Sequence, residues 1–231
     1  MRTNTKRIMT RLILLLATVS ATLAQPSAQG VNFYSIEREI ELGKQLASKT
    51  QASRQAQPDT RLQAIGDKLA AKTDGTFQCH FFVYATVDPQ AEPIALPGGP
   101  VFVAQSMVSA DDYVTAAVQA HAIAHIVLRH YTREMTRTEL MEIGKKSMPP
   151  NLGSASSSPA IEMGIAQFKK KFELDADRLA VKLMIDAGYD PQALVRWLQS
   201  LPTPQKAGLL DDFPAPSRRI EVVQQAIDAA H

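Results

Sequence analysis

The sequence has a single cysteine and few aromatic residues. Cys79 stands alone among 231 residues, and Phe, Trp and Tyr make up 6% of the chain. One cysteine excludes an intrachain disulfide and a cysteine zinc cluster. Neither sign of charge dominates, with 25 basic and 23 acidic residues, and no apolar run beyond the first residues is long enough to span a membrane. The remaining composition, 45% hydrophobic and 21% charged, is typical of a globular domain.

The first residues differ from the rest of the chain. Basic residues precede an apolar run from Leu12 to Ala17, and small residues follow as far as Ala24. This order predicts a signal peptide over residues 1–24. A retained membrane anchor is the alternative, but the apolar run is short for a span. We therefore expect an exported protein, in the bacterial periplasm or secreted, with no stable membrane span after cleavage.

The charge that remains after cleavage gives no argument for a nucleic-acid partner. The leader carries four basic residues and no acidic ones, which leaves 21 basic against 23 acidic residues. The mature protein would therefore be slightly acidic, although the whole sequence has a pI of 8.6. A basic patch that attracts phosphates is not indicated by this balance.

The periodicity of the chain predicts mainly helices with a small β-sheet. After a linker at residues 25–34, Ser35 and Asp59 are suited to cap two helices. Apolar spacing predicts further helices over residues 111–131 with a broken continuation to 146, 161–187, 190–200 and 217–230. Strands are expected over 77–87 and from 101, and loops over 148–160 and 202–216. The pattern indicates one α+β domain over residues 35–231.

The segment from His121 to His125 is the most informative in the chain. Two histidines four residues apart lie on one face of a helix, so both can reach a single metal ion. The spacing matches the zinc-protease motif H-E-x-x-H, but Ala122 stands where the glutamate belongs. That glutamate accepts a proton from the attacking water and passes it to the leaving amine. Ala122 can do neither, so the segment predicts a zinc site and leaves proteolysis in doubt.

Glu173 is the candidate for a third metal ligand, since a catalytic zinc takes three protein ligands. It lies on the next long predicted helix, and Asp177 follows one turn later on the same face. An aspartate there can accept the N–H of a ligand histidine and fix its tautomer. The alternatives are a chance histidine pair and an ordinary solvated helix face. The apolar residues around His125 favour a buried helix, where histidines need partners, either a metal or buried carboxylates.

Four ordered motifs resemble one metallopeptidase family, that of the CaaX prenyl endopeptidases, the heat-shock protease HtpX and the periplasmic proteases of outer-membrane assembly. The motifs are Ala95–Gly99, His121–His130, Glu173–Leu179 and Ala187–Pro191, and the segment Ser35–Gly43 is similar to the start of the family's soluble bacterial members. The resemblance covers nearly all of residues 33–225. It implies a mainly helical, zincin-like (gluzincin) domain with endopeptidase activity on proteins.

The resemblance also implies roles for single residues. One Zn²⁺ per chain would be held by His121, His125 and Glu173, with Asp177 beside a ligand histidine. Arg219 would be able to stabilise a developing oxyanion, a surface arginine being the alternative.

The resemblance also implies a substrate edge, and it extends to His130. The strand after the Pro97-Gly98-Gly99 turn, with Val101, would be the edge that pairs with an extended substrate. His130 would be a family position too, but it points away from the helix face of His121 and His125, so we expect a structural role for it.

Three departures from the family pattern bear on activity. Ala122 replaces the general base, Phe213 stands where the family often has a histidine before proline, and Glu92-Pro93 stand where Asn-Ala is usual. Two origins fit Ala122, namely natural loss and a substitution introduced to trap substrate. The other two departures favour natural loss, because an engineered change would leave the rest of the site intact.

Three functions are compatible with these residues. The leading hypothesis is an exported zinc-binding protein of the metalloendopeptidase fold whose peptidase activity is lost or strongly impaired, and which binds extended or unfolded polypeptide. The first alternative is an active zinc metalloendopeptidase that hydrolyses misfolded exported proteins, either with another base or with Ala122 as an artificial change. The second alternative is a metal-free binding module. None of the three has a nucleic-acid partner.

Overall fold

The computed structural model describes residues 30–87, 92–109, 111–147, 159–201 and 213–230. The stretch Val31–His231 forms one compact unit. The predicted signal peptide and most of the linker lie outside the described residues, as do residues 148–158 of one predicted loop and 202–212 of the other. Those assignments therefore stay predictions. In the described part of the chain, every helix is too short or too polar to cross a membrane.

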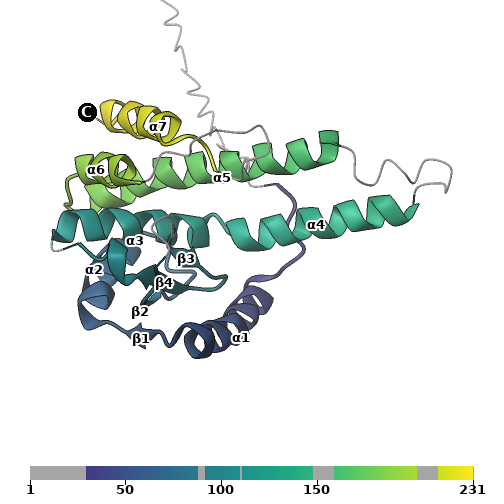
Figure 1. Cartoon of the computed structure of the whole chain (residues 1–231), viewed down its shortest axis with the longest axis horizontal. Helices are drawn as coiled ribbons and strands as arrows, with labels where there is room; N and C mark the ends of the chain where they lie inside the picture. Colours follow the sequence, from purple (N-terminus) through teal and green to yellow (C-terminus); the bar gives the residue numbers. More distant parts are fainter. Residues whose placement is uncertain (1–29, 88–91, 110, 148–158, 202–212, 231) are drawn as a thin grey trace, which may run out of the picture. The chain divides into compact units, whose positions relative to one another are not determined.

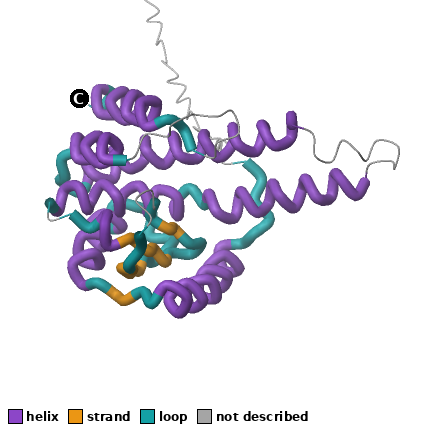
Figure 2. Tube along the Cα trace, in the orientation of Figure 1, coloured by secondary structure: helices purple, strands orange, loops and turns teal. Residues whose placement is uncertain are grey.

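Helices make up most of the described chain and surround one small sheet (Figure 1, Figure 2). The helices are α1 Ile36–Arg54, α2 Thr60–Ala70, α3 Asp112–Val127, α4 His130–Ser147, α5 Pro159–Asp186, α6 Gln192–Ser200 and α7 Pro216–Asp228. The strands are β1 Gln57–Pro58, β2 His80–Tyr84, β3 Ile94–Ala95 and β4 Pro100–Ala104, and a 3₁₀ turn spans Gln105–Met107. This confirms the predicted mainly helical α+β fold.

Three of the helices begin where a polar side chain caps them. Ser35 accepts a hydrogen bond from the Arg38 amide at the start of α1, and Asp59 accepts one from Leu62 at the start of α2. Asp111 caps α3 in the same way. Each cap satisfies an amide that lacks a partner within its helix. The sequence had predicted all three helix starts.

The sheet has the strand order β1-β2-β4-β3, with β2 and β4 parallel and both outer pairs antiparallel. The strand β4 is buried along its whole length. Its side chains alternate, as in any strand: Val101 and Val103 join the main core, whereas Phe102 and Ala104 join a second core shared with Ala47 of α1. The sheet is therefore covered on both faces.

The predicted substrate edge is wrong, because β4 lies between β2 and β3 and presents no free edge. The prediction had placed that edge at Pro97, Gly98, Gly99 and Val101. The glycine turn instead packs against the body of the protein. A Cβ on Gly98 would lie 2.6 Å from the Ile40 Cα, and one on Gly99 would lie 1.9 Å from the Gln78 carbonyl oxygen. The outer strand on this side of the sheet is β3, which precedes the turn.

The helix α3 is the centre of the fold and packs against α2, α5 and α6. It is buried on nearly every side, as expected for a helix with apolar residues all round. Ile123 shares one hydrophobic core with leucines from the three neighbours: Leu62, Leu183 and Leu194, each at most 2% exposed. This packing fixes the two histidines of α3 in the interior.

Gly66 offers a test of how tightly α2 packs on the sheet. A Cβ at Gly66 would lie 2.0 Å from the ring of Phe81, which is buried, whereas one at Gly144 of α4 meets no atom within 4 Å. We expect Gly66→Ala to lower the free energy of unfolding by about 1–3 kcal/mol through overpacking. Gly144→Ala is the matched control and should raise it by up to about 1 kcal/mol through helix propensity. Urea unfolding followed by circular dichroism measures both.

Candidate metal centre

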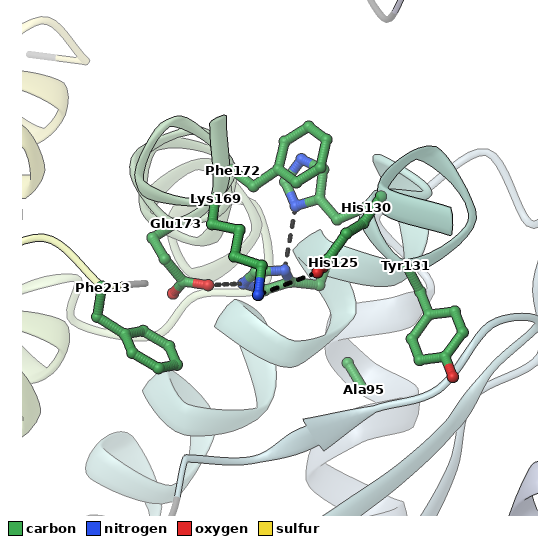
Figure 3. A pocket seen from close by; sticks show the side chains of 9 residues that line it. Ala95, His125, His130, Tyr131, Lys169, Phe172, Glu173 and Phe213 are labelled. Carbon is green, nitrogen blue, oxygen red and sulfur yellow. Dashed lines mark hydrogen bonds and ion pairs between the residues drawn. The ribbon is translucent and has the colours of Figure 1, made fainter. Parts of the chain in front are cut away.

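Three predicted ligands meet at one point between α3 and α5. The Nε2 atoms of His121 and His125 lie 3.1 Å apart. The Oε2 atom of Glu173, on α5, lies 3.3 Å from the Nε2 atom of His121, and its Oε1 atom lies 3.4 Å from the Nε2 atom of His125. Donor atoms of the three residues all lie within 4.8 Å of one another. Figure 3 shows the carboxylate of Glu173 directed at the ring of His125.

These separations fit a single tetrahedral metal ion. Zinc bonds to histidine nitrogen and carboxylate oxygen are about 2.0–2.2 Å long, which sets tetrahedral ligand atoms about 3.3–3.6 Å apart. The Oε2 atom of Glu173 is buried and makes no hydrogen bond. Two nitrogens and a carboxylate that face one another in a buried site are the donor set of such an ion. The residues present therefore fit a metal.

Asp177 lies where the sequence predicted, beside His121. Its Oδ1 atom is 3.0 Å from the Nδ1 atom of His121, and the side chain of Asp177 is fully buried. A carboxylate on Nδ1 holds the proton there and leaves Nε2 free to face the other donors. The structure thus brings all four of these predicted residues together.

Arg219 of α7 is 1% exposed, so it is not a surface arginine. Its Nε and Nη2 atoms donate to the two oxygens of Asp177 at 2.8 and 2.9 Å, and its Nη1 atom donates to Glu92 at 3.1 Å. This two-pronged pairing is the strong form of an arginine–carboxylate contact. The guanidinium is therefore held by carboxylates, and a role for Arg219 at an oxyanion stays a prediction.

The charges at the centre are strongly coupled. Burial and the charge of Arg219 lower the pKa of His121, but Asp177 and Glu173 outweigh them and raise it to about 9. Burial alone would raise the pKa of Glu173, but His125 and His121 hold it well below its usual range. Without a metal, a proton on His121 therefore neutralises part of the carboxylate charge. A cation would replace that proton.

His130 does not point away from the centre as predicted. Its Nδ1 atom lies 3.1 Å from the Nδ1 atom of His125, and its ring stacks on Phe172 at 4.0 Å between centroids. The prediction continued the helical period past His125, whereas α3 ends at Val127 and Arg129 adopts a left-handed φ of 57°. Burial, together with the charges of neighbours, lowers the pKa of His130 to about 2, so its ring is neutral.

A pocket of about 180 Å³ opens beside the donors (Figure 3). Ala95 of the outer strand β3 lines one side, and Phe213 lines it where the family pattern often has a histidine. The described residues that line it are Ala95, His125, His130, Tyr131, Glu134, Lys169, Phe172, Glu173 and Phe213. Tyr131, Glu134 and Lys169 could not be predicted as pocket residues, because nothing in their spacing separates them from ordinary residues on a helix surface.

Comparison with known proteins assigns the family. The profile of peptidase family M48 matches residues 56–227. The chain belongs to peptidase family M48. This confirms the resemblance on which the ligand roles were predicted, and with it a metallopeptidase fold.

The relatives of this M48 chain include proteases from bacteria and fungi. It is 27% identical over 186 residues to the beta-barrel assembly-enhancing protease of Yersinia pestis, a match that covers 72% of this chain and 38% of the relative. It is 32% identical over 112 residues to the mitochondrial metalloendopeptidase OMA1 of Schizosaccharomyces pombe, covering 46% of this chain and 33% of the relative. The chain thus spans little more than a third of the length of these relatives.

Proposed function

We propose that this chain is an exported zinc-binding protein of the M48 fold whose peptidase activity is lost or strongly reduced, and that it binds extended or unfolded polypeptide. The observation that carries the proposal is the convergence of three donors from His121, His125 and Glu173 beside Ala122. The donors support metal binding, and the alanine removes the group that moves protons in the H-E-x-x-H motif.

The residues around the pocket support the loss of activity. Bound zinc would polarise a peptide carbonyl as a Lewis acid, but a proton acceptor is still required for the water. Among the described residues that line the pocket, the carboxylates are Glu134 and Glu173. Glu173 belongs to the donor set, and Glu134 is paired with Lys169 at 3.2 Å. Neither stands at the position of the missing glutamate, which Ala122 occupies.

The outer strand β3 supports the binding of extended polypeptide. Among the described residues it pairs only with β4, and its residue Ala95 lines the pocket next to the donors. An extended peptide can add to such an edge through main-chain hydrogen bonds, which give affinity with little dependence on sequence. This binding mode suits a protein that recognises unfolded chains.

The cellular location forms part of the same proposal. A leader over residues 1–24 would direct export, and residues 35–231 would form the zinc-binding domain after the linker at 25–34. Relatives named beta-barrel assembly-enhancing protease favour the bacterial periplasm over release from the cell. Fractionation of cells that express the whole chain, with N-terminal sequencing of the mature protein, tests this part.

The central test measures metal and polypeptide binding on the same protein. We expect the purified chain to hold about one zinc per molecule by elemental analysis, in the ratio of a single three-ligand site. We expect the His121→Ala variant to lose the zinc. We expect the unmodified chain to bind fluorescently labelled unfolded casein without cutting it. A metal-free chain whose unfolding is unchanged by a chelator, or one that binds no casein, would contradict the proposal.

An active zinc endopeptidase is the second candidate. The complete donor set and the relatives named as proteases favour it. It requires zinc-dependent cleavage of casein by the chain as it stands. Such cleavage, abolished by a chelator and restored by zinc, would replace the first proposal with this one.

His130 should tune zinc affinity through His125. Its contact with the Nδ1 atom of His125 would hold that ring with Nε2 toward the metal, and such supporting contacts affect metal affinity by about 10–100-fold. We expect His130→Phe, which keeps the stacking on Phe172, to weaken zinc binding by that factor in competition with a chromophoric chelator. His80→Phe, at an exposed histidine on β2, is the matched control and should leave the affinity unchanged. Equal affinities in both variants would show that His130 only packs.

A further inference from the structure

A second cavity lies between α4 and α5, and nothing in the proposed zinc chemistry uses it. It has a volume of about 350 Å³. The helices α4 and α5 run side by side past the end of the sheet, like two arms (Figure 1). We call the cavity between them the arm groove. Its described lining residues are Glu134, Arg137, Thr138, Leu140, Met141, Gly164, Ile165, Phe168 and Lys169.

The floor of the arm groove is apolar and accessible. The apolar side chain of Leu140 is 44% exposed to solvent, and Met141 and Ile165 are only partly buried. Arg137 lies over the ring of Phe168 with its guanidinium carbon 3.0 Å from the ring centroid, so its stem widens the apolar wall. An apolar groove with a charged rim is typical of a site that receives an apolar side chain.

The arm groove adjoins the pocket at the metal donors. Glu134 and Lys169 line both cavities, and their ion pair, 3.2 Å between Oε1 and Nζ, marks the boundary. The side chains of the pair are 44% and 28% exposed. Ion pairs this exposed to water contribute little to stability. A polypeptide that leaves the metal pocket along α5 can therefore displace the pair and enter the groove.

The length of α5 sets the register of such a polypeptide. Phe168 and Ile165 precede Glu173 by five and eight residues, which places them about 7 to 12 Å from it along the helix axis. An extended chain advances about 3.3 Å per residue. The groove thus lies about two to four residues from the position opposite the metal donors.

We propose that the arm groove binds a large apolar side chain of an extended polypeptide, about two to four residues from the residue that faces the metal donors. The inference rests on the proposed function and adds a substrate class to it, namely unfolded segments with an exposed Leu, Phe or Met at that spacing. Met141 provides a flexible wall that can adapt to side chains of different shape. The boundary that the groove shares with the metal pocket favours this occupant over a second copy of the chain.

Peptides with a terminal hydroxamate test the inference, because the hydroxamate binds zinc and fixes the register. A fluorescent Gly/Ser peptide series carries one leucine at positions one to six from the hydroxamate, and its binding to the zinc-loaded chain is measured by fluorescence anisotropy. We expect affinity to peak with leucine at positions two to four, about tenfold above the leucine-free peptide, as for burial of one aliphatic side chain. Leu140→Asp should abolish this peak and leave the leucine-free peptide unaffected.

Ile143→Asp is the matched control. Ile143 lies on the same helix, is 57% exposed and does not line the groove, so its replacement should retain the peak. The inference would be overturned if affinity did not depend on the position of the leucine and if Leu140→Asp bound every peptide as tightly as the unmodified chain. The proposed function would then still stand. Failure of every hydroxamate peptide to bind would overturn both. Conversion of a dimer to a monomer by Leu140→Asp in sedimentation would assign the groove to self-association and overturn the inference alone.

Discussion

Ala122→Glu is expected to raise the rate of casein cleavage by about 10²–10⁴-fold, the usual contribution of a general base. Positions 122 and 125 are three apart on α3, so their side chains are neighbours on the helix surface. A carboxylate at 122 would lie beside His125, next to the donors that converge on one point. The variant therefore adds the missing proton acceptor to a site whose other parts are already in place.

Two measurements make this expectation decisive. Ala122 is fully buried, so a longer side chain there also has to displace its neighbours. Ala122→Gln is the matched control: it has the same size as the glutamate and can accept no proton, so it should show no gain in rate. Zinc content and the thermal midpoint of each variant separate a chemical effect from a folding defect.

Each result assigns a different cause. If only the glutamate variant cuts, the cleft is competent and Ala122 is the lesion. If the chain as it stands cuts equally fast, the proposed loss of activity is wrong. If both variants keep zinc and neither cuts, the lesion lies at another position. The candidates are Phe213, which lines the pocket, and Glu92, which pairs with Arg219, because both depart from the family pattern.

The helices and the donor set could be predicted because their signals are local. Ser35, Asp59 and Asp111 are capping residues that act within three positions along the chain, and each begins a helix. The spacing of His121 and His125 places both on one helix face without reference to other elements. Glu173 could be named as a candidate from its place on the next long helix. Its approach to the histidines could not be derived in this way, because it depends on how α5 packs against α3.

The errors arose where the answer depends on distant contacts. The order β2-β4-β3 depends on which strand takes the middle of the sheet, and the turn residues Gly98 and Gly99 predict a reversal without saying which arm is outermost. The position of His130 depends on the break at Arg129. That left-handed residue has no glycine to signal it and is held by Glu39, which accepts from its Nε atom at 2.6 Å. A non-glycine residue in this conformation costs about 1–3 kcal/mol and persists only where such contacts fix it.

The arm groove was invisible for a related reason. Leu140 and Ile165 lie on two helices with ordinary amphipathic patterns, and a leucine on the apolar side of a helix is usually part of a core. Only the separation of α4 from α5 leaves these side chains around a cavity. The same apolar residues could therefore line a binding groove or fill a core. Only the packing of the two helices decides which of these they do.

Arg219→Leu is expected to lower the free energy of unfolding by about 3–5 kcal/mol, measured by urea denaturation in the presence of a chelator so that zinc loss does not contribute. Removing one partner of a buried ion pair leaves the other charge without compensation. Here two carboxylates would be stranded, Asp177, which is fully buried, and Glu92. The charge of Arg219 also helps to lower the pKa of Asp177, although burial opposes it.

The neighbouring arginine supplies the matched control for this prediction. Arg218 pairs with Glu221 on the surface of the same helix, with both side chains about half exposed. Arg218→Leu should therefore change the free energy of unfolding by no more than about 0.5 kcal/mol. Arg219→Lys should fall between the two, because an ammonium keeps the charge but cannot make the two-pronged contact to Asp177. Equal effects at positions 218 and 219 would show that the buried network adds nothing to stability, and that the carboxylates around the metal donors balance their charge without Arg219.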